Sequence, residues 1–131
     1  HAPSSRDGCV LFVKLRQFGG PGRQHSRLLL NDMPWEPTSE DGVQIRTLYQ
    51  DTSGVHSEHI RVERWHAGKV ISRTLPDLCE YLVLSGNVHE AGDLLQPHSW
   101  LRTPAGYAAA FTVDSGADVE VYIKEGEWRA T

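Results

Sequence analysis

Two short clusters are the closest that this sequence comes to a reactive site. His56 and His59 flank Glu58, and imidazole and carboxylate groups together are typical metal ligands. On a β-strand, however, His56 and Glu58 share one face and His59 lies on the other. Cys79 precedes Glu80, whose negative charge opposes the thiolate that a catalytic cysteine needs. We therefore predict that the histidine cluster is a surface loop or strand and that Cys79 is a buried core residue.

Composition limits the functional class. The chain has 131 residues, enough for one domain with a hydrophobic core, and its formal net charge of −4 predicts neither nucleic-acid nor membrane binding. Residues 8–31 include no acidic residue, which indicates either a solvated linker or a contact with an acidic partner. The only cysteines, Cys9 and Cys79, favour free thiols and a cytoplasmic location. Because the chain starts with His1 instead of Met, we expect a fragment or a processed protein.

Short β-strand signals dominate the chain. Runs of apolar or alternating residues are separated by turns rich in Gly, Asp, Ser and Pro, and no segment keeps an apolar period of 3.6 residues. We predict strands at residues 9–18, 43–50, 59–65, 81–84, 100–103 and 119–124. Many short strands joined by short turns are typical of an all-β sandwich or barrel.

Two runs of residues carry a family pattern. The segment from Ser99 to Gly106 reads Ser-Trp-Leu-Arg-Thr-Pro-Ala-Gly, and residues 81–86 read Tyr-Leu-Val-Leu-Ser-Gly. The first run resembles the second motif of the cupin superfamily, most closely in the cupin domain of ChrR-type anti-sigma factors. The second run resembles the strand and turn that close the first cupin motif. The resemblance covers about residues 35–128 and implies an antiparallel jelly-roll barrel, also called a double-stranded β-helix.

The metal ligands of that family are replaced in this chain. Depending on whether the first motif is aligned on Gly86 or on Gly68, the positions of its two histidines and its glutamate hold Arg73, Leu75 and Cys79 or Thr74, Pro76 and Glu80. Ala109 stands where the second motif has its histidine. A cupin metal needs convergent imidazole nitrogens and a carboxylate, so we expect no metal and no other cofactor in this barrel.

The first residues resemble the end of a preceding cupin unit. Residues 1–14 can be laid over residues 109–124, with a glycine followed by a strand that ends in lysine. We predict a terminal strand segment of a preceding unit at 1–18, a linker at 19–34 and a C-terminal cupin domain without metal-ligand histidines at 35–131. His1 falls at the second-motif histidine of that preceding unit, so the resemblance implies that it binds zinc or another divalent metal there.

The barrel interior is the remaining place for a ligand. Small β-barrels either fill their interior with side chains or hold one small molecule, and we expect a filled interior. The side chains that could line a pocket are Arg73, Glu80, Arg102, Trp65, Tyr81 and Tyr107.

The resemblance implies a regulatory or binding module. ChrR-type proteins regulate transcription by binding an extracytoplasmic-function sigma factor through a separate zinc-binding helical domain, and their cupin part senses a signal. The implied partners are that sigma factor, through a domain outside this chain, the preceding cupin unit, and a second copy in a homodimer. One alternative is a bicupin metal-dependent dioxygenase acting on small diketones or aromatic ketones. Another is a structural module that completes a neighbouring barrel.

Overall fold

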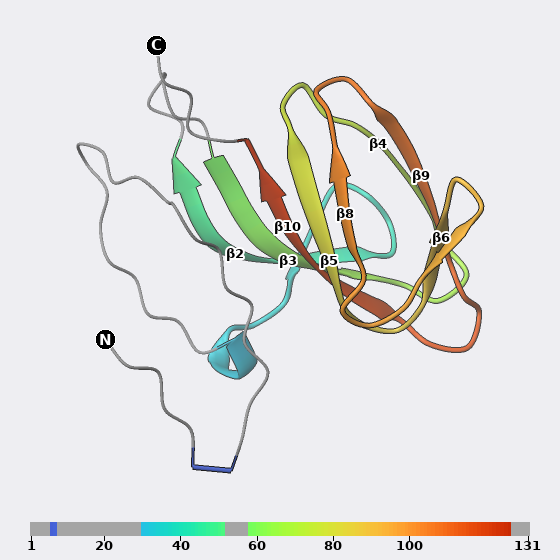
Figure 1. Cartoon of the computed structure of the whole chain (residues 1–131). Helices are drawn as coiled ribbons and strands as arrows, with labels where there is room; N and C mark the ends of the chain where they lie inside the picture. Colours follow the sequence, from blue (N-terminus) through green and yellow to red (C-terminus); the bar gives the residue numbers. More distant parts are fainter. Residues whose placement is uncertain (1–5, 8–29, 52–57, 127–131) are drawn as a thin grey trace.

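The computed structural model describes residues 6–7, 30–51 and 58–126, and these form an almost purely β structure (Figure 1). A short 3-10 helix, η1, comes first and is followed by strands that are mostly short. The elements are η1 (Leu30–Asp32), β1 (Glu36–Pro37), β2 (Val43–Asp51), β3 (Glu58–Trp65), β4 (Val70–Thr74), β5 (Cys79–Ser85), β6 (Val88–Glu90), β7 (Asp93–Leu95), β8 (Trp100–Thr103), β9 (Ala108–Val113) and β10 (Val119–Glu125).

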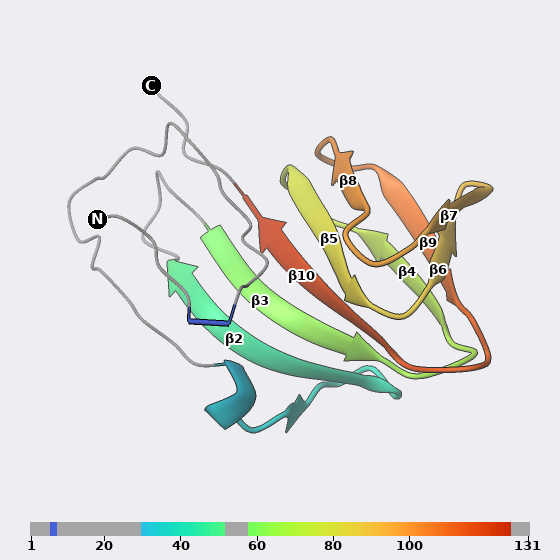
Figure 2. The same cartoon turned by 60° about the horizontal axis from the view of Figure 1, so that its bottom comes forward.

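The strands form two antiparallel sheets that face each other (Figures 1 and 2). One sheet has the order β1-β2-β3-β10-β5-β8 and the other has the order β4-β9-β6-β7. Every connection from β3 onward passes from one sheet to the other, except that from β6 to β7. This topology is an antiparallel jelly-roll barrel, which confirms the all-β fold predicted from the sequence.

The hydrophobic core lies between the two sheets. Strand β9 shows why: Ala109, Phe111 and Val113 are buried, whereas the residues between them are exposed, as expected for a strand with one face on the core. The ring of Phe111 lies 4.9 Å from that of Trp65 and 4.9 Å from that of Tyr81. These three rings come from both sheets and form the centre of the core.

Five of the predicted strands are confirmed. The segments at 43–50, 59–65, 81–84, 100–103 and 119–124 correspond to β2, β3, β5, β8 and β10. The predicted strand at 9–18 lies outside the described residues, as do His1 and His56. Strands β1, β4, β6, β7 and β9 were not predicted, and β9 begins with three alanines, which have low β-propensity. Pairing between β4 and β9 along five residues stabilises both.

Gly86 shows how the chain changes sheets between β5 and β6. Its φ angle is +80°, and a Cβ atom at this position would lie 2.5 Å from the carbonyl oxygen of Asp118. Only glycine fits this backbone conformation and this close approach.

Among the described residues, no helix has the length and apolar character needed to cross a membrane.

Candidate functional site

Strand β3 carries charged residues into the barrel. Arg61, Glu63 and Trp65 lie opposite Ile123, Val121 and Val119 of β10, and antiparallel partners share one face of a sheet. The three β10 residues belong to the hydrophobic core. Arg61 and Glu63 are therefore core-facing, and their side chains are only 5% and 4% exposed.

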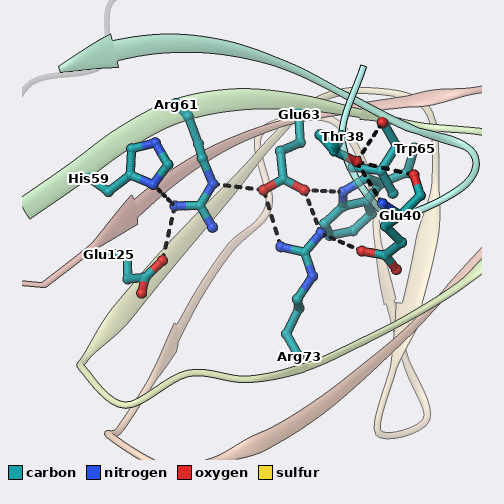
Figure 3. A network of polar contacts seen from close by, with 9 residues as sticks. Thr38, Glu40, His59, Arg61, Glu63, Trp65, Arg73 and Glu125 are labelled. Carbon is teal, nitrogen blue, oxygen red and sulfur yellow. Dashed lines mark hydrogen bonds and ion pairs between the residues drawn. The ribbon is translucent and has the colours of Figure 1, made fainter. Parts of the chain in front are cut away.

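Glu63 is the centre of a buried polar network (Figure 3). Arg73 donates to both carboxylate oxygens, from Nη2 to Oε1 at 2.7 Å and from Nη1 to Oε2 at 3.1 Å. Arg61 Nε donates to Oε2 at 2.7 Å, and Trp65 Nε1 donates to Oε1 at 2.9 Å. Each carboxylate oxygen of Glu63 thus accepts two hydrogen bonds, and three of these four bonds come from charged guanidinium groups.

The Arg73–Glu63 ion pair joins the two sheets. Arg73 lies on β4, in register with Ala109 of β9, and the preceding pair on the same face is Ile71 with Phe111, both fully buried. Arg73 therefore points inward from the four-stranded sheet toward Glu63 of the six-stranded sheet. Its planar guanidinium suits this two-point contact in a way that a lysine ammonium would not.

Glu40 extends the network from the turn before β2. Its Oε2 accepts a hydrogen bond from Arg73 Nη2 at 3.1 Å. Thr38 fixes this turn, since its hydroxyl donates to the carbonyl oxygen of Val43 at 2.9 Å and accepts from the backbone N–H of Glu40 at 3.1 Å. Arg73 thus forms ion pairs with two carboxylates, that of the buried Glu63 and that of the partly exposed Glu40.

The other end of the network involves Arg61. Its Nη1 donates to Glu125 Oε1 at 3.1 Å and lies 3.1 Å from His59 Nδ1. Burial lowers the pKa of His59, and the nearby charge of Arg61 lowers it further. Glu58 and His59 belong to β3, and Glu58 is only 5% exposed. The predicted surface position is therefore wrong for Glu58.

Electrostatics keep the network ionised. Burial by itself would raise the pKa of Glu63, but the hydrogen bonds and positive charge of Arg73, together with the charge of Arg61, lower it to about 2. Burial likewise disfavours the charged form of Arg73, and the contacts with Glu63 outweigh it and raise the pKa. Glu63 is therefore a carboxylate throughout the neutral range and a poor proton acceptor there.

The structure decides between the two motif alignments. With Gly86 as reference, the histidine and glutamate positions include Arg73 and Cys79, which point into the barrel. With Gly68 as reference they include Thr74 and Pro76, which are exposed. Within the described part of the chain, no three His, Cys, Asp or Glu side chains converge in a way that could hold a metal ion. The residues around Arg73 and Ala109 thus do not fit the ligand set of a cupin metal.

The six predicted pocket residues do not form one site. Trp65, Arg73 and Tyr81 meet in the interior, where the side chains pack against one another. Glu80 and Arg102 face each other across β5 and β8 on the opposite side of that sheet from Cys79 and Tyr81. Tyr107 is exposed, and its hydroxyl donates to Glu90 Oε2 at 2.9 Å.

Sequence reasoning missed Glu63, Arg61 and Glu40. A signal for the first two was present, because opposite charges two residues apart on a strand lie on one face, next to the inward-facing Trp65. Nothing in the local sequence identifies Glu40, whose contact with Arg73 depends on the turn before β2.

Cys79 is fully buried and is a free thiol, as predicted. Burial raises its pKa to about 11, although a hydrogen bond with Tyr81 opposes this change. Almost none of it is thiolate at neutral pH, so it is a poor nucleophile.

A surface groove of about 550 Å³ lies outside the barrel, along the turn before β2. It has side chains of both signs, including Glu40, Arg64 and Lys69, and His66 at its border is 72% exposed. Lys69 Nζ lies 3.8 Å from Asp41 Oδ2. Most of its lining side chains are polar or charged and the charges of opposite sign compensate one another, so it lacks the features of a small-molecule pocket.

The fold, but not the sequence, has many known counterparts. The chain matches no protein-family model and no curated protein. It resembles the anti-sigma protein ChrR of Rhodobacter sphaeroides, solved in complex with SigE, with a TM-score of 0.62, 17% identity and coverage of 74% of this chain. This chain spans 50% of that one.

Two other solved structures extend the comparison. An RmlC-like cupin protein of Ralstonia eutropha has a TM-score of 0.67 and 14% identity over 79% of this chain and 69% of its own. A candidate acetylacetone dioxygenase of Methylibium petroleiphilum has a TM-score of 0.66 and 13% identity over 82% of this chain and 81% of its own. At such identities the likeness establishes the cupin fold and leaves the function open.

Proposed function

We propose that this chain is a regulatory cupin module of the kind found in ChrR-type anti-sigma factors, working in the cytoplasm with a barrel that holds no metal. The observation that carries the proposal is the buried network around Glu63, in which the guanidinium groups of Arg61 and Arg73 are the cations beside the carboxylate. A site that holds a fixed positive charge next to its carboxylate repels a metal cation.

The chemistry of the described interior favours binding or regulation over catalysis. A general base works best with a pKa near the operating pH, whereas the pKa of Glu63 is about 2. A nucleophilic cysteine needs a lowered pKa, whereas that of Cys79 is about 11. Both groups serve packing and ion pairing better than proton or group transfer.

The proposed partner is an extracytoplasmic-function sigma factor, bound through a domain outside this chain. The structural likeness to ChrR supports this assignment, together with the run from Ser99 to Gly106. We further propose that a preceding cupin unit packs next to this module and that His1 is one ligand of its zinc or other divalent metal.

A transcription assay tests the regulatory role. The full-length protein and a version without residues 35–126 would be co-expressed with an extracytoplasmic-function sigma factor of the same organism and a reporter for that sigma factor. We expect both to bind the sigma factor and only the full-length protein to release it in response to the signal. Equal regulation by both versions would contradict the proposal.

Metal analysis tests the barrel itself. The purified chain, dialysed after incubation with zinc, iron, manganese or nickel, should contain far less than one equivalent of metal by mass spectrometry, because Arg73 and Ala109 offer no ligand atoms. A chain with His1→Ala controls for binding at the terminus. One equivalent of metal retained by both chains would contradict a metal-free barrel.

A dioxygenase is the second candidate, favoured by the likeness to the Methylibium protein. Oxygen consumption with acetylacetone would be measured for the full-length protein and for its His1→Ala variant. We expect no consumption that depends on this chain's own barrel. Activity that Arg73→Ala abolishes and His1→Ala preserves would instead assign an enzymatic role to this barrel.

A further inference from the structure

Strand β8 is an edge strand of the six-stranded sheet, and it carries Trp100 and Arg102 on its outer face. It pairs with β5, and within the described residues no strand pairs with its other side. Trp100 is 51% exposed, although tryptophan is generally well buried. Trp100 and Arg102 lie opposite Leu82 and Glu80 on the outer face of the sheet, whereas Leu101 packs toward the core.

We propose that two copies of this chain associate by antiparallel pairing of their β8 strands about a two-fold axis at Leu101. An edge strand presents unpaired backbone N–H and C=O groups to which a second strand can hydrogen-bond. In a two-fold interface, both copies contribute the same surface. In this register Trp100 of each copy lies opposite the partner's Arg102. Both side chains are on the outer face, at the separation where cross-strand pairs interact.

The sequence of β8 is self-complementary in this arrangement. Trp100 and Arg102 flank Leu101 symmetrically, so the two-fold axis produces two equivalent contacts between a cation and an indole ring. The chain already uses this contact, because the guanidinium carbons of Arg46 and Arg64 lie 4.1 Å and 4.4 Å from the centre of the Trp35 ring. Such contacts are attractive because the ring face carries negative charge.

A matched pair of variants tests the register. Sedimentation equilibrium would measure association of the chain and of Trp100→Glu and Trp100→Arg. Both variants lose the indole, but Glu places a carboxylate opposite the partner's Arg102, whereas Arg places two cations together. We expect Trp100→Glu to associate at least about tenfold more tightly than Trp100→Arg. Val70→Glu and Val70→Arg change a 59% exposed residue on β4 and should leave association unchanged.

A mixing experiment separates loss of pairing from loss of folding. Trp100→Arg and Arg102→Glu should each be monomeric alone, the second because the indole then faces a carboxylate. Mixed, they should form a heterodimer, since Arg at 100 of one chain lies opposite the Glu at 102 of the other and the second Trp–Arg contact is intact. A monomeric unmodified chain at all accessible concentrations, equal behaviour of the two Trp100 variants, or no association in the mixture would overturn the proposal.

Discussion

Glu63 is held by three side chains at once, Arg61, Arg73 and Trp65. Moving ions out of water costs several kcal/mol per charge, and good geometry with full hydrogen bonding is needed to offset it. The two-point contact with Arg73 and the added donors provide that geometry. Consequently, replacing one charged member of the network should cost more stability than replacing all of them by apolar residues, because the remaining buried charges would lose their partner.

Glu63→Gln tests this dependence directly. The amide keeps the size of the side chain but leaves Arg61 and Arg73 without their shared buried counter-charge. We expect the free energy of unfolding, measured in urea, to fall by about 3–5 kcal/mol. Glu36→Gln, at an exposed position on β1, should change it by less than about 0.5 kcal/mol. A loss below about 1 kcal/mol for Glu63→Gln would show that the network adds little to stability.

Turns decide which sheet each strand joins. Strands β5 and β6 belong to different sheets although only Gly86 and Asn87 separate them. The change of direction depends on the positive φ of Gly86 and on its close approach to Asp118. Gly68, between β3 and β4, has a similar φ of +79° but open space where a Cβ would point. A side chain at Gly68 would therefore cause backbone strain alone, whereas one at Gly86 would cause both strain and a steric clash.

Three alanine substitutions measure the two effects. Gly116→Ala meets no atom within 4 Å and has no positive φ, so it should be nearly neutral. Gly68→Ala adds strain only and should lower the free energy of unfolding by about 1–2 kcal/mol. Gly86→Ala adds a clash with backbone and should cost more than Gly68→Ala. Urea unfolding ranks the three, and equal losses at Gly68 and Gly86 would remove the role assigned to Asp118.

The whole barrel is tied together by charges as well as by its core. The contact between Arg73 of β4 and Glu63 of β3 crosses from one sheet to the other through the interior. Since the pKa of Glu63 is lowered from 4.5 to about 2, the stability that this ion pair contributes depends on pH. A carboxylate with a lowered pKa stabilises the folded state above its unfolded pKa, and that stability is lost as the pH falls.

Acid unfolding of the chain should show this linkage. At pH 7 the lowered pKa of Glu63 corresponds to about 3 kcal/mol of stability, and this part disappears between pH 4.5 and about 2. The difference in free energy of unfolding between the chain and its Glu63→Gln variant should therefore shrink across this interval. Urea unfolding at a series of pH values measures it, and a difference that stays constant with pH would contradict the lowered pKa.

The sequence by itself determined the β architecture. Alternation along a strand and turn-forming glycines are local signals, so five strands and an all-β sandwich or barrel could be predicted from them, whereas the jelly roll was implied by the resemblance to cupins. Only the tertiary structure decided what fills the interior. Glu63 and Arg73 belong to different sheets, and Glu40 reaches them from a turn, so their meeting depends on how the sheets pack. The same packing brought Arg73 inward and left Glu80 and Arg102 on the outer face, because the pleat of each strand assigns neighbouring residues to opposite sides.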